Sequence, residues 1–192
     1  MEIKEYIVLR DEEHHPCLKV KNEIKWNKSF LITENIINFL NETYYMNQLN
    51  EEYVYVISLN CQMKPLGVFQ LSHGNWFQTD IKMRELGIFL LLTGAERFII
   101  AHNHPNGSCQ PSEGDFKITN KMNEFSDLID IQLLQHYVIG KNDWDGIIYN
   151  EDEDYDEYEN EDNDEDDMPF GIWIDCSMVI GGIYNDSRRI RE

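Results

Sequence analysis

Residues 97–115 read RFIIAHNHPNGSCQPSEGD, and this segment combines a strand, a tight turn and the start of a helix. The apolar run RFIIA predicts a short strand that ends at His102. The Pro-Asn-Gly sequence at 105–107 forces a turn. Ser112 follows a proline and is a favourable residue to cap the next helix. Helices mixed with strands are typical of an α/β or α+β fold.

Three side chains of this segment, His102, His104 and Asp115, have a spacing that suits one metal ion. The two histidines are two residues apart at the end of a strand, so their side chains point to the same side. Asp115 lies three residues after the cap, where its carboxylate can swing back toward them. Two histidines and one aspartate leave a fourth ligand position open, as in catalytic zinc sites. The competing interpretation is a pair of histidines on a surface turn.

Apolar periodicity predicts the elements on either side of this segment. Thr33 is expected to be the N-cap of a helix that extends to about Gln48. Helices are expected at 33–48, 76–92 and 112–127, and strands at 6–9, 52–59, 66–72, 97–101, 131–139 and 170–180. The expected fold is a curved mixed sheet flanked by helices.

The formal charge of −20 is concentrated in one tract. Residues 151–167 hold 13 of the 36 acidic residues and no basic one, which leaves 16 basic against 23 acidic residues elsewhere, or −7. A surface of this sign disfavours binding to a nucleic-acid backbone. The tract is too charged to pack, and it is either a solvated insertion or a segment that binds partners or cations.

The remaining composition indicates a protein of the cytoplasm. No apolar run reaches the roughly 18 to 20 residues that span a bilayer, and the first 15 residues lack the pattern of a signal peptide. The four cysteines, Cys17, Cys61, Cys109 and Cys176, include no C-x-x-C pair and are expected to be free thiols.

The pattern His102-x-His104, seven residues, Ser112, two residues, Asp115 resembles the JAMM motif of the JAB1/MPN/Mov34 metalloenzymes. The local sequence HNHPNG followed by PSEGD is most similar to the RadC-like branch, which usually has serine where this chain has Asn106. The resemblance extends from about residue 35 to residue 140. It implies a JAB/MPN-like fold, related to that of cytidine deaminases, and one zinc ion held by the two histidines and the aspartate.

The same resemblance implies a mechanism in which zinc-activated water attacks an amide bond. Glu52 is the expected general base, and Glu85 and Glu51 are the alternatives. Ser112 is expected to steady the oxyanion of the intermediate. His136 matches a family histidine and has either a structural hydrogen-bonding role or a role beside the metal ligands or the substrate.

Four parts of the chain are expected. They are an N-terminal extension of a strand plus loop (1–30), a RadC-like JAB/MPN domain (31–145), an acidic disordered loop (146–168), and a C-terminal strand and tail (169–192). The expected function is a zinc metallopeptidase or isopeptidase that acts on a protein or peptide. The alternatives are a metal-dependent nuclease or DNA-repair protein and a non-catalytic interaction module. The sequence leaves the substrate, the cleaved bond and the oligomeric state open.

Overall fold

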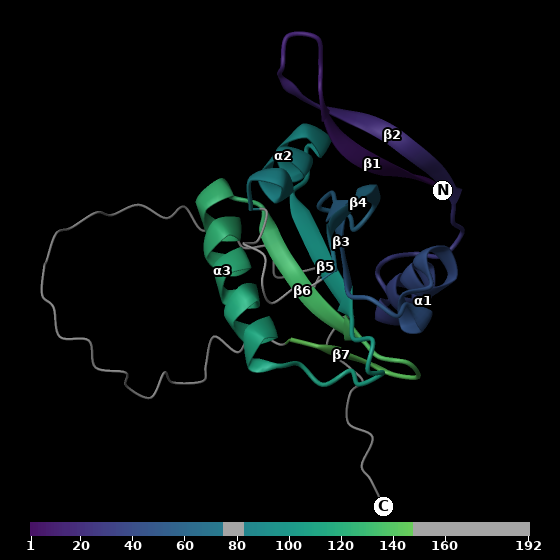
Figure 1. Ribbon diagram of the computed structural model, residues 1–192. Helices are drawn as coiled ribbons and strands as arrows, with labels where there is room; N and C mark the ends of the chain where they lie inside the picture. The colour runs from purple at the N-terminus through teal and green to yellow at the C-terminus, as the bar shows by residue number, and fades with distance from the viewer. Residues whose placement is uncertain (75–82, 148–192) are drawn as a thin grey trace, which may run out of the picture. The chain divides into compact units, whose positions relative to one another are not determined.

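The computed structural model describes residues 1–74 and 83–147, which form a layered body of helices and strands (Figure 1). The start of the helix expected at 76–92, nearly all of the acidic loop, the strand expected at 170–180 and Cys176 lie outside the described residues. Within the described part of the chain, no helix is long and apolar enough to cross a membrane.

Seven strands form one mixed sheet of order β2-β1-β4-β3-β5-β6-β7. Their bounds are β1 Glu2–Arg10, β2 Pro16–Lys25, β3 Tyr53–Leu59, β4 Pro65–His73, β5 Arg97–Asn103, β6 Gln132–Ile139 and β7 Trp144–Gly146. The β1–β4 and β5–β6 pairs are parallel, and the other neighbouring pairs are antiparallel. β5 therefore lies inside the sheet, between β3 and β6.

Helices cover both faces of this sheet. Helix α1 (Thr33–Tyr44) lies on one face, and α2 (Met83–Thr93) and α3 (Glu113–Ile129) lie on the other (Figure 1). The side chains of β5 alternate accordingly, with Ile99 in the core beneath α1 and Phe98 and Ile100 in the core beneath α2 and α3. The mixed α+β class expected from the sequence is confirmed. His102 continues the series that faces α2 and α3.

The N-terminal extension contains a second strand where the sequence predicts a loop. Strand β2 pairs antiparallel with β1 along its whole length, from Arg10↔Pro16 to Glu2↔Lys25. Its side chains are mostly exposed because it is an edge strand, so it lacks the apolar alternation that marks a half-buried strand. The buried Glu5 of β1 holds it further, accepting hydrogen bonds from Lys21 and Asn22.

The first helix also differs from the prediction at both ends. Its N-cap is Ile32, without a side-chain cap bond, and the Thr33 hydroxyl instead lies 3.3 Å from the Tyr137 hydroxyl. The Thr33 side chain therefore contacts a distant residue, Tyr137, and does not cap the helix as its residue type predicts. The α-helix stops at Tyr44 because Tyr45 adopts a left-handed conformation with φ 56°, and the short 3-10 helix η1 (Met46–Gln48) follows.

Candidate metal centre

The two histidines of the candidate site lie at the end of β5. His102 is the penultimate residue of this strand and is completely buried on the face covered by α2 and α3. His104 is the first residue beyond the strand, and its N–H donates to the carbonyl oxygen of Ile139 at 3.0 Å. The neighbouring strand β6 therefore fixes the backbone of the second histidine.

A tight turn sends the chain from His104 back toward α3. The N–H of Gly107 donates to the His104 carbonyl at 2.9 Å, and Gly107 has φ 83°, which favours glycine. The loop then packs against the backbone of Gly140. A Cβ atom at Gly140 would lie 2.7 Å from the Gly107 carbonyl oxygen and 2.9 Å from the Cys109 nitrogen. The absence of a side chain at 140 lets the loop approach the sheet.

Ser112 is the N-cap of α3, as the sequence predicts, and it forms a complete capping box with Asp115. The Asp115 N–H donates to Ser112 Oγ at 3.2 Å. In return, the Ser112 N–H and hydroxyl both donate to Asp115 Oδ2 at 2.7 Å. This exchange fixes one carboxylate oxygen of a completely buried aspartate.

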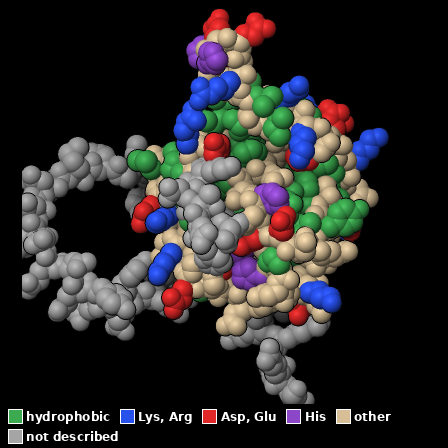
Figure 2. Space-filling view, in the orientation of Figure 1, with side chains coloured by type: hydrophobic (Ala, Val, Ile, Leu, Met, Phe, Trp, Pro, Cys, Tyr) green, Lys and Arg blue, Asp and Glu red, His purple; other side chains and the backbone are tan. Residues whose placement is uncertain are grey.

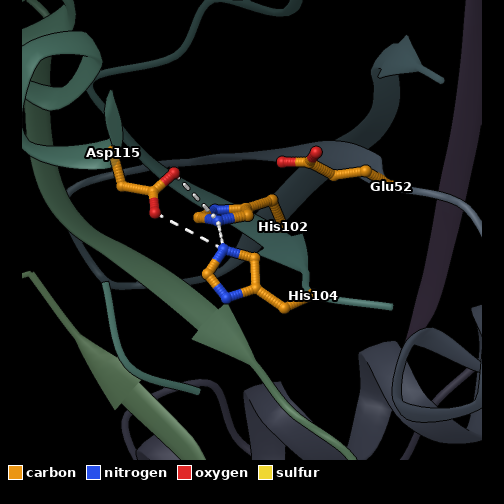
Figure 3. Close-up of side chains that lie close together, drawn as sticks. All are labelled: Glu52, His102, His104 and Asp115. Atoms are coloured by element: carbon orange, nitrogen blue, oxygen red, sulfur yellow. Dashed lines mark hydrogen bonds and ion pairs between the residues drawn. The ribbon is translucent and has the colours of Figure 1, made fainter. Parts of the chain in front are cut away.

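The structure brings His102, His104 and Asp115 together (Figure 3). The two histidine Nε2 atoms are 3.0 Å apart. His102 Nε2 lies 3.1 Å from Asp115 Oδ1, and His104 Nε2 lies 3.4 Å from Asp115 Oδ2. Ligands 2.0–2.1 Å from a tetrahedral zinc ion are about 3.3 Å apart. The spacing and the chemistry of these donors therefore fit one metal ion.

Glu52 is the fourth member of the cluster. Its carboxylate and the three donors have ligand atoms that all lie within 4.8 Å of one another. Figure 3 shows Glu52 and Asp115 on opposite sides of the histidine pair. Glu52 is half-buried, and His104 keeps 10% of its side chain exposed. The face drawn in Figure 2 likewise carries histidine and acidic side chains together near its middle.

Neither alternative to Glu52 belongs to this cluster of described residues. The carboxylate of Glu51 instead contacts His73, at 2.7 Å between Oε2 and Nε2. Glu85 lies in the first turn of α2. Among the three candidate bases, Glu52 is therefore the one whose carboxylate lies beside the histidines, and its role as the base remains a prediction.

Asn103, between the two histidines, fixes the segment that carries Glu52. Its Oδ1 accepts from the Tyr53 N–H, and its Nδ2 donates to the Glu51 carbonyl, both at 2.9 Å. One buried amide thus binds the backbone on both sides of Glu52. The role of Asn103 was not predicted from the sequence, because both of its hydrogen-bond partners are distant along the chain.

Burial and hydrogen bonding set the ionisation of these groups. Burial alone would raise the pKa of the Asp115 carboxyl, but contacts with the His102 and His104 rings lower this pKa below its usual value. Burial lowers the pKa of His102, whereas the hydrogen bond to Asp115 raises the pKa of His104. A neutral His102 beside an ionised Asp115 is the state that a metal ion requires of its ligands.

His136 lies behind the histidine pair and contacts the ligand cluster. Its Nε2 atom is 2.8 Å from His102 Nδ1, and its Nδ1 atom is 2.7 Å from the Thr119 hydroxyl. These contacts are structural hydrogen bonds and also lie beside a candidate metal ligand, so both roles expected from the sequence remain predictions. Thr119 was not predicted, although its position four residues after Asp115 places both on one face of α3.

The sequence from residue 32 to residue 150 matches the family model of the RadC-like JAB domain. The chain belongs to this family. Among curated relatives, this RadC-like JAB domain protein is 31% identical over 122 residues to a UPF0758 protein of Pasteurella multocida, covering 64% of this chain and 54% of the relative. It is 28% identical over 125 residues to a UPF0758 protein of Coprothermobacter proteolyticus, covering 64% of this chain and 53% of the relative. It is 35% identical over 95 residues to a UPF0758 protein of Clostridium acetobutylicum, covering 50% of this chain and 42% of the relative.

The RadC-like JAB domain protein spans about half the length of the curated relatives that it matches. The matched region contains all four members of the cluster, because Glu52, His102, His104 and Asp115 lie between residues 32 and 150. The names of these relatives state no activity. The family assignment and the side-chain cluster therefore support a metal site, while the reaction has to be argued from the chemistry of the residues.

Proposed function

We propose that this RadC-like JAB domain is a zinc-dependent hydrolase that cleaves an amide bond in a protein or peptide. The observation that carries the proposal is the half-buried carboxylate of Glu52 beside the three donors His102, His104 and Asp115. A purely structural zinc site has four protein ligands and no open position. Three ligands with a separate carboxylate within reach are the arrangement of a hydrolytic site.

His102, His104 and Asp115 would hold the zinc ion. When bound, zinc lowers the pKa of a coordinated water toward about 7 and polarises a carbonyl group. The Glu52 carboxylate takes a proton from the attacking water and later gives that proton to the leaving amine. The hydrogen bonds of Asn103 to the backbone on both sides of Glu52 keep this carboxylate beside the histidines.

In this mechanism the Ser112 hydroxyl both holds Asp115 and stabilises the oxyanion. Its hydroxyl donates to Asp115 Oδ2 at 2.7 Å, so in this state its proton holds a ligand. Stabilising an oxyanion requires that proton to point at the substrate instead. We propose that Ser112 orients Asp115 in the resting site and turns toward the oxyanion during the reaction. The Ser112 N–H also donates to Asp115 Oδ2 and keeps the carboxylate in place meanwhile.

The charge of the chain favours a protein or peptide substrate over a nucleic acid. Outside residues 151–167, 23 acidic residues exceed 16 basic ones. Binding to a phosphate backbone depends on Lys and Arg side chains that displace counterions. A neutral or basic peptide has no such requirement.

The test combines metal analysis with the Glu52→Gln variant. Protein purified without chelator should contain about one zinc ion per chain by plasma mass spectrometry. Glu52→Gln should keep the zinc, because the amide leaves all three ligands in place. It should hydrolyse a quenched-fluorescent peptide library about 10²–10⁴-fold more slowly, which is the usual contribution of a general base.

Glu51→Gln is the matched control, because Glu51 is the neighbouring acid and contacts His73 instead of the cluster. It should retain both zinc and peptide hydrolysis. A Glu52→Gln protein as active as wild type would refute the general-base role. Wild-type protein that cuts plasmid DNA and leaves peptides intact would refute the amide-bond proposal in favour of a nuclease.

A further inference from the structure

We propose that Thr119 and His136 are positioning residues that fix the tautomer of His102, so that its Nε2 atom presents a lone pair to the metal site. This inference rests on the proposed zinc site but can be tested in metal-free protein. It assigns a task to two buried polar side chains that the hydrolytic mechanism leaves unused.

Four groups behind the candidate metal site form a series of hydrogen-bonding contacts. His102 Nδ1 lies 2.8 Å from His136 Nε2, and His136 Nδ1 lies 2.7 Å from Thr119 Oγ1. Thr119 Oγ1 lies 2.6 Å from the carbonyl oxygen of Asp115. The series therefore begins on one metal ligand and ends on the backbone of another.

The last group sets the direction of the whole series. A backbone carbonyl can only accept, so the single proton of the Thr119 hydroxyl points at Asp115. Thr119 Oγ1 must then accept from His136, which places the His136 proton on Nδ1. A neutral His136 has no proton left on Nε2, which accepts from the Nδ1–H of His102. The His102 Nε2 atom is left with its lone pair.

This direction matters because Asp115 favours the opposite tautomer. Its Oδ1 atom lies 3.1 Å from His102 Nε2, so in metal-free protein the carboxylate attracts a proton to that nitrogen. A proton on Nε2 would block coordination, since a metal ligand must offer a lone pair there. The contact with His136 opposes this effect from the other side of the ring.

Burial makes the series difficult to replace with water. His102, His136 and Asp115 are completely buried, and Thr119 is 1% exposed. A lost partner would therefore remain unsatisfied. Helix α3 carries both Thr119 and Asp115, so one rigid element sets the tautomer of one ligand and the position of another.

Thr119→Val tests the series because valine has nearly the same shape and no hydroxyl, and Thr119→Ser is the matched control that keeps the hydroxyl. Zinc affinity is measured by competition with a chromophoric chelator, and folding of the metal-free proteins by circular dichroism. Thr119→Val should weaken zinc binding about 10–100-fold, the usual effect of losing a group that orients a ligand. Thr119→Ser should stay within about threefold of wild type.

His136→Gln provides a second test of the same hydrogen-bond series. Its side-chain oxygen can accept from His102 Nδ1–H without help from Thr119, because an amide has no tautomer to set. Adding Thr119→Val to His136→Gln should therefore change zinc affinity by less than about threefold. Equal losses from Thr119→Val in both backgrounds would overturn the proposal, as would equal losses from the valine and serine variants.

Long-range ¹⁵N–¹H NMR of the histidine rings in metal-free protein reads the tautomer directly. Wild type should show the proton of His102 on Nδ1, and Thr119→Val should move population toward Nε2–H. A wild-type His102 that carries its proton mainly on Nε2 would overturn the inference, even if Thr119→Val fails to fold. Wild-type protein that binds no zinc but shows the Nδ1–H tautomer would refute the proposed function and leave this inference standing.

Discussion

At the scale of single residues, Asn103 connects the two halves of the candidate site. It stands between His102 and His104 in the chain, and its side chain holds the backbone on both sides of Glu52. His102 lies in β5 and the proposed base Glu52 immediately precedes β3, and this amide links the ends of the two strands. The histidines can be predicted from the sequence by their spacing. The amide cannot, because its partners lie about 50 positions away, at Glu51 and Tyr53.

Asn103→Ala should lower the free energy of unfolding by about 1–3 kcal/mol, because it leaves the part-buried N–H of Tyr53 and carbonyl of Glu51 without their partner. The Tyr53 amide should also exchange its hydrogen faster, since it loses its acceptor. Urea denaturation and hydrogen exchange measure the two effects.

Asn106→Ala is the control for this variant, because it removes one exposed hydrogen bond from the turn after the histidines. Asn106→Ala should lower the free energy of unfolding by less than about 1 kcal/mol. An Asn103→Ala protein with wild-type stability and unchanged Tyr53 exchange would show that the amide does not hold the Glu52 segment.

At the scale of elements, the start of α3 joins helix stability to the geometry of the site. The capping box that begins the helix is also the contact that fixes Asp115 Oδ2. The start of α3 was predictable, because a serine three residues before an aspartate favours a helix N-cap, and in the structure these two residues hydrogen-bond to each other. The N-cap of α1 was not, because the Thr33 hydroxyl is used by Tyr137, a contact across 104 positions.

Ser112→Ala should lower the free energy of unfolding by about 1 kcal/mol through loss of the cap. It should also weaken zinc binding, because Asp115 Oδ2 loses one of its two donors from residue 112. Ser112→Thr keeps a capping hydroxyl and should preserve most of both properties. If alanine and threonine have the same effect in urea denaturation and chelator competition, the hydroxyl is not what fixes Asp115.

The loop between the histidines and α3 depends on a close approach at Gly140. Gly140→Ala places a methyl group against the backbone of Gly107 and Cys109, which cannot rotate away. We expect a loss of about 1–3 kcal/mol in the free energy of unfolding, as for other overpacked sites, together with weaker zinc binding.

Gly146→Ala is the control for this substitution, since the nearest atoms to its methyl group would belong to the side chain of Gln135, at 3.0 Å or more. Its loss of stability in urea denaturation should be smaller. Equal stabilities of the two variants would show that the loop is free to move away from the sheet.

The two edge strands of the sheet, β2 and β7, could not be predicted from the sequence. Strand β2 at one edge is mostly exposed, and β7 at the other has three residues, so neither offers the periodicity that reveals a strand. The inner strands β3 and β5 are buried along nearly their whole length and were predicted from their apolar runs. Burial on both faces produces a sequence signal that edge strands lack.

At the scale of the whole molecule, stability should fall at high pH because of buried tyrosines. Burial, with a smaller effect of the nearby Glu5 carboxylate, raises the pKa values of Tyr44 and Tyr55 above their usual value. The folded protein therefore keeps these phenol protons, whereas the unfolded chain releases them near pH 10. The stabilisation that these two protonated phenols contribute is complete below pH 10. The free energy of unfolding should decrease as the pH rises above 10.

Tyr44→Phe should reduce this pH dependence, as measured by urea denaturation between pH 8 and pH 11. Its hydroxyl is buried without a hydrogen-bond partner among the described residues, so its loss should not lower stability at pH 7. Tyr45→Phe, at a neighbouring tyrosine that is 60% exposed, should leave the dependence unchanged. A Tyr44→Phe protein with the wild-type alkaline slope would contradict this explanation.

The donors of the candidate site come from parts of the chain that only the finished fold brings together. An unfolded chain offers a metal ion little more than His102 and His104, which are two positions apart. Zinc held by the native arrangement would therefore favour folding by mass action, by about 2.7 kcal/mol when free zinc is at 100 times its dissociation constant. For this protein, the supply of zinc in the cell would help to set how many copies survive in the folded form.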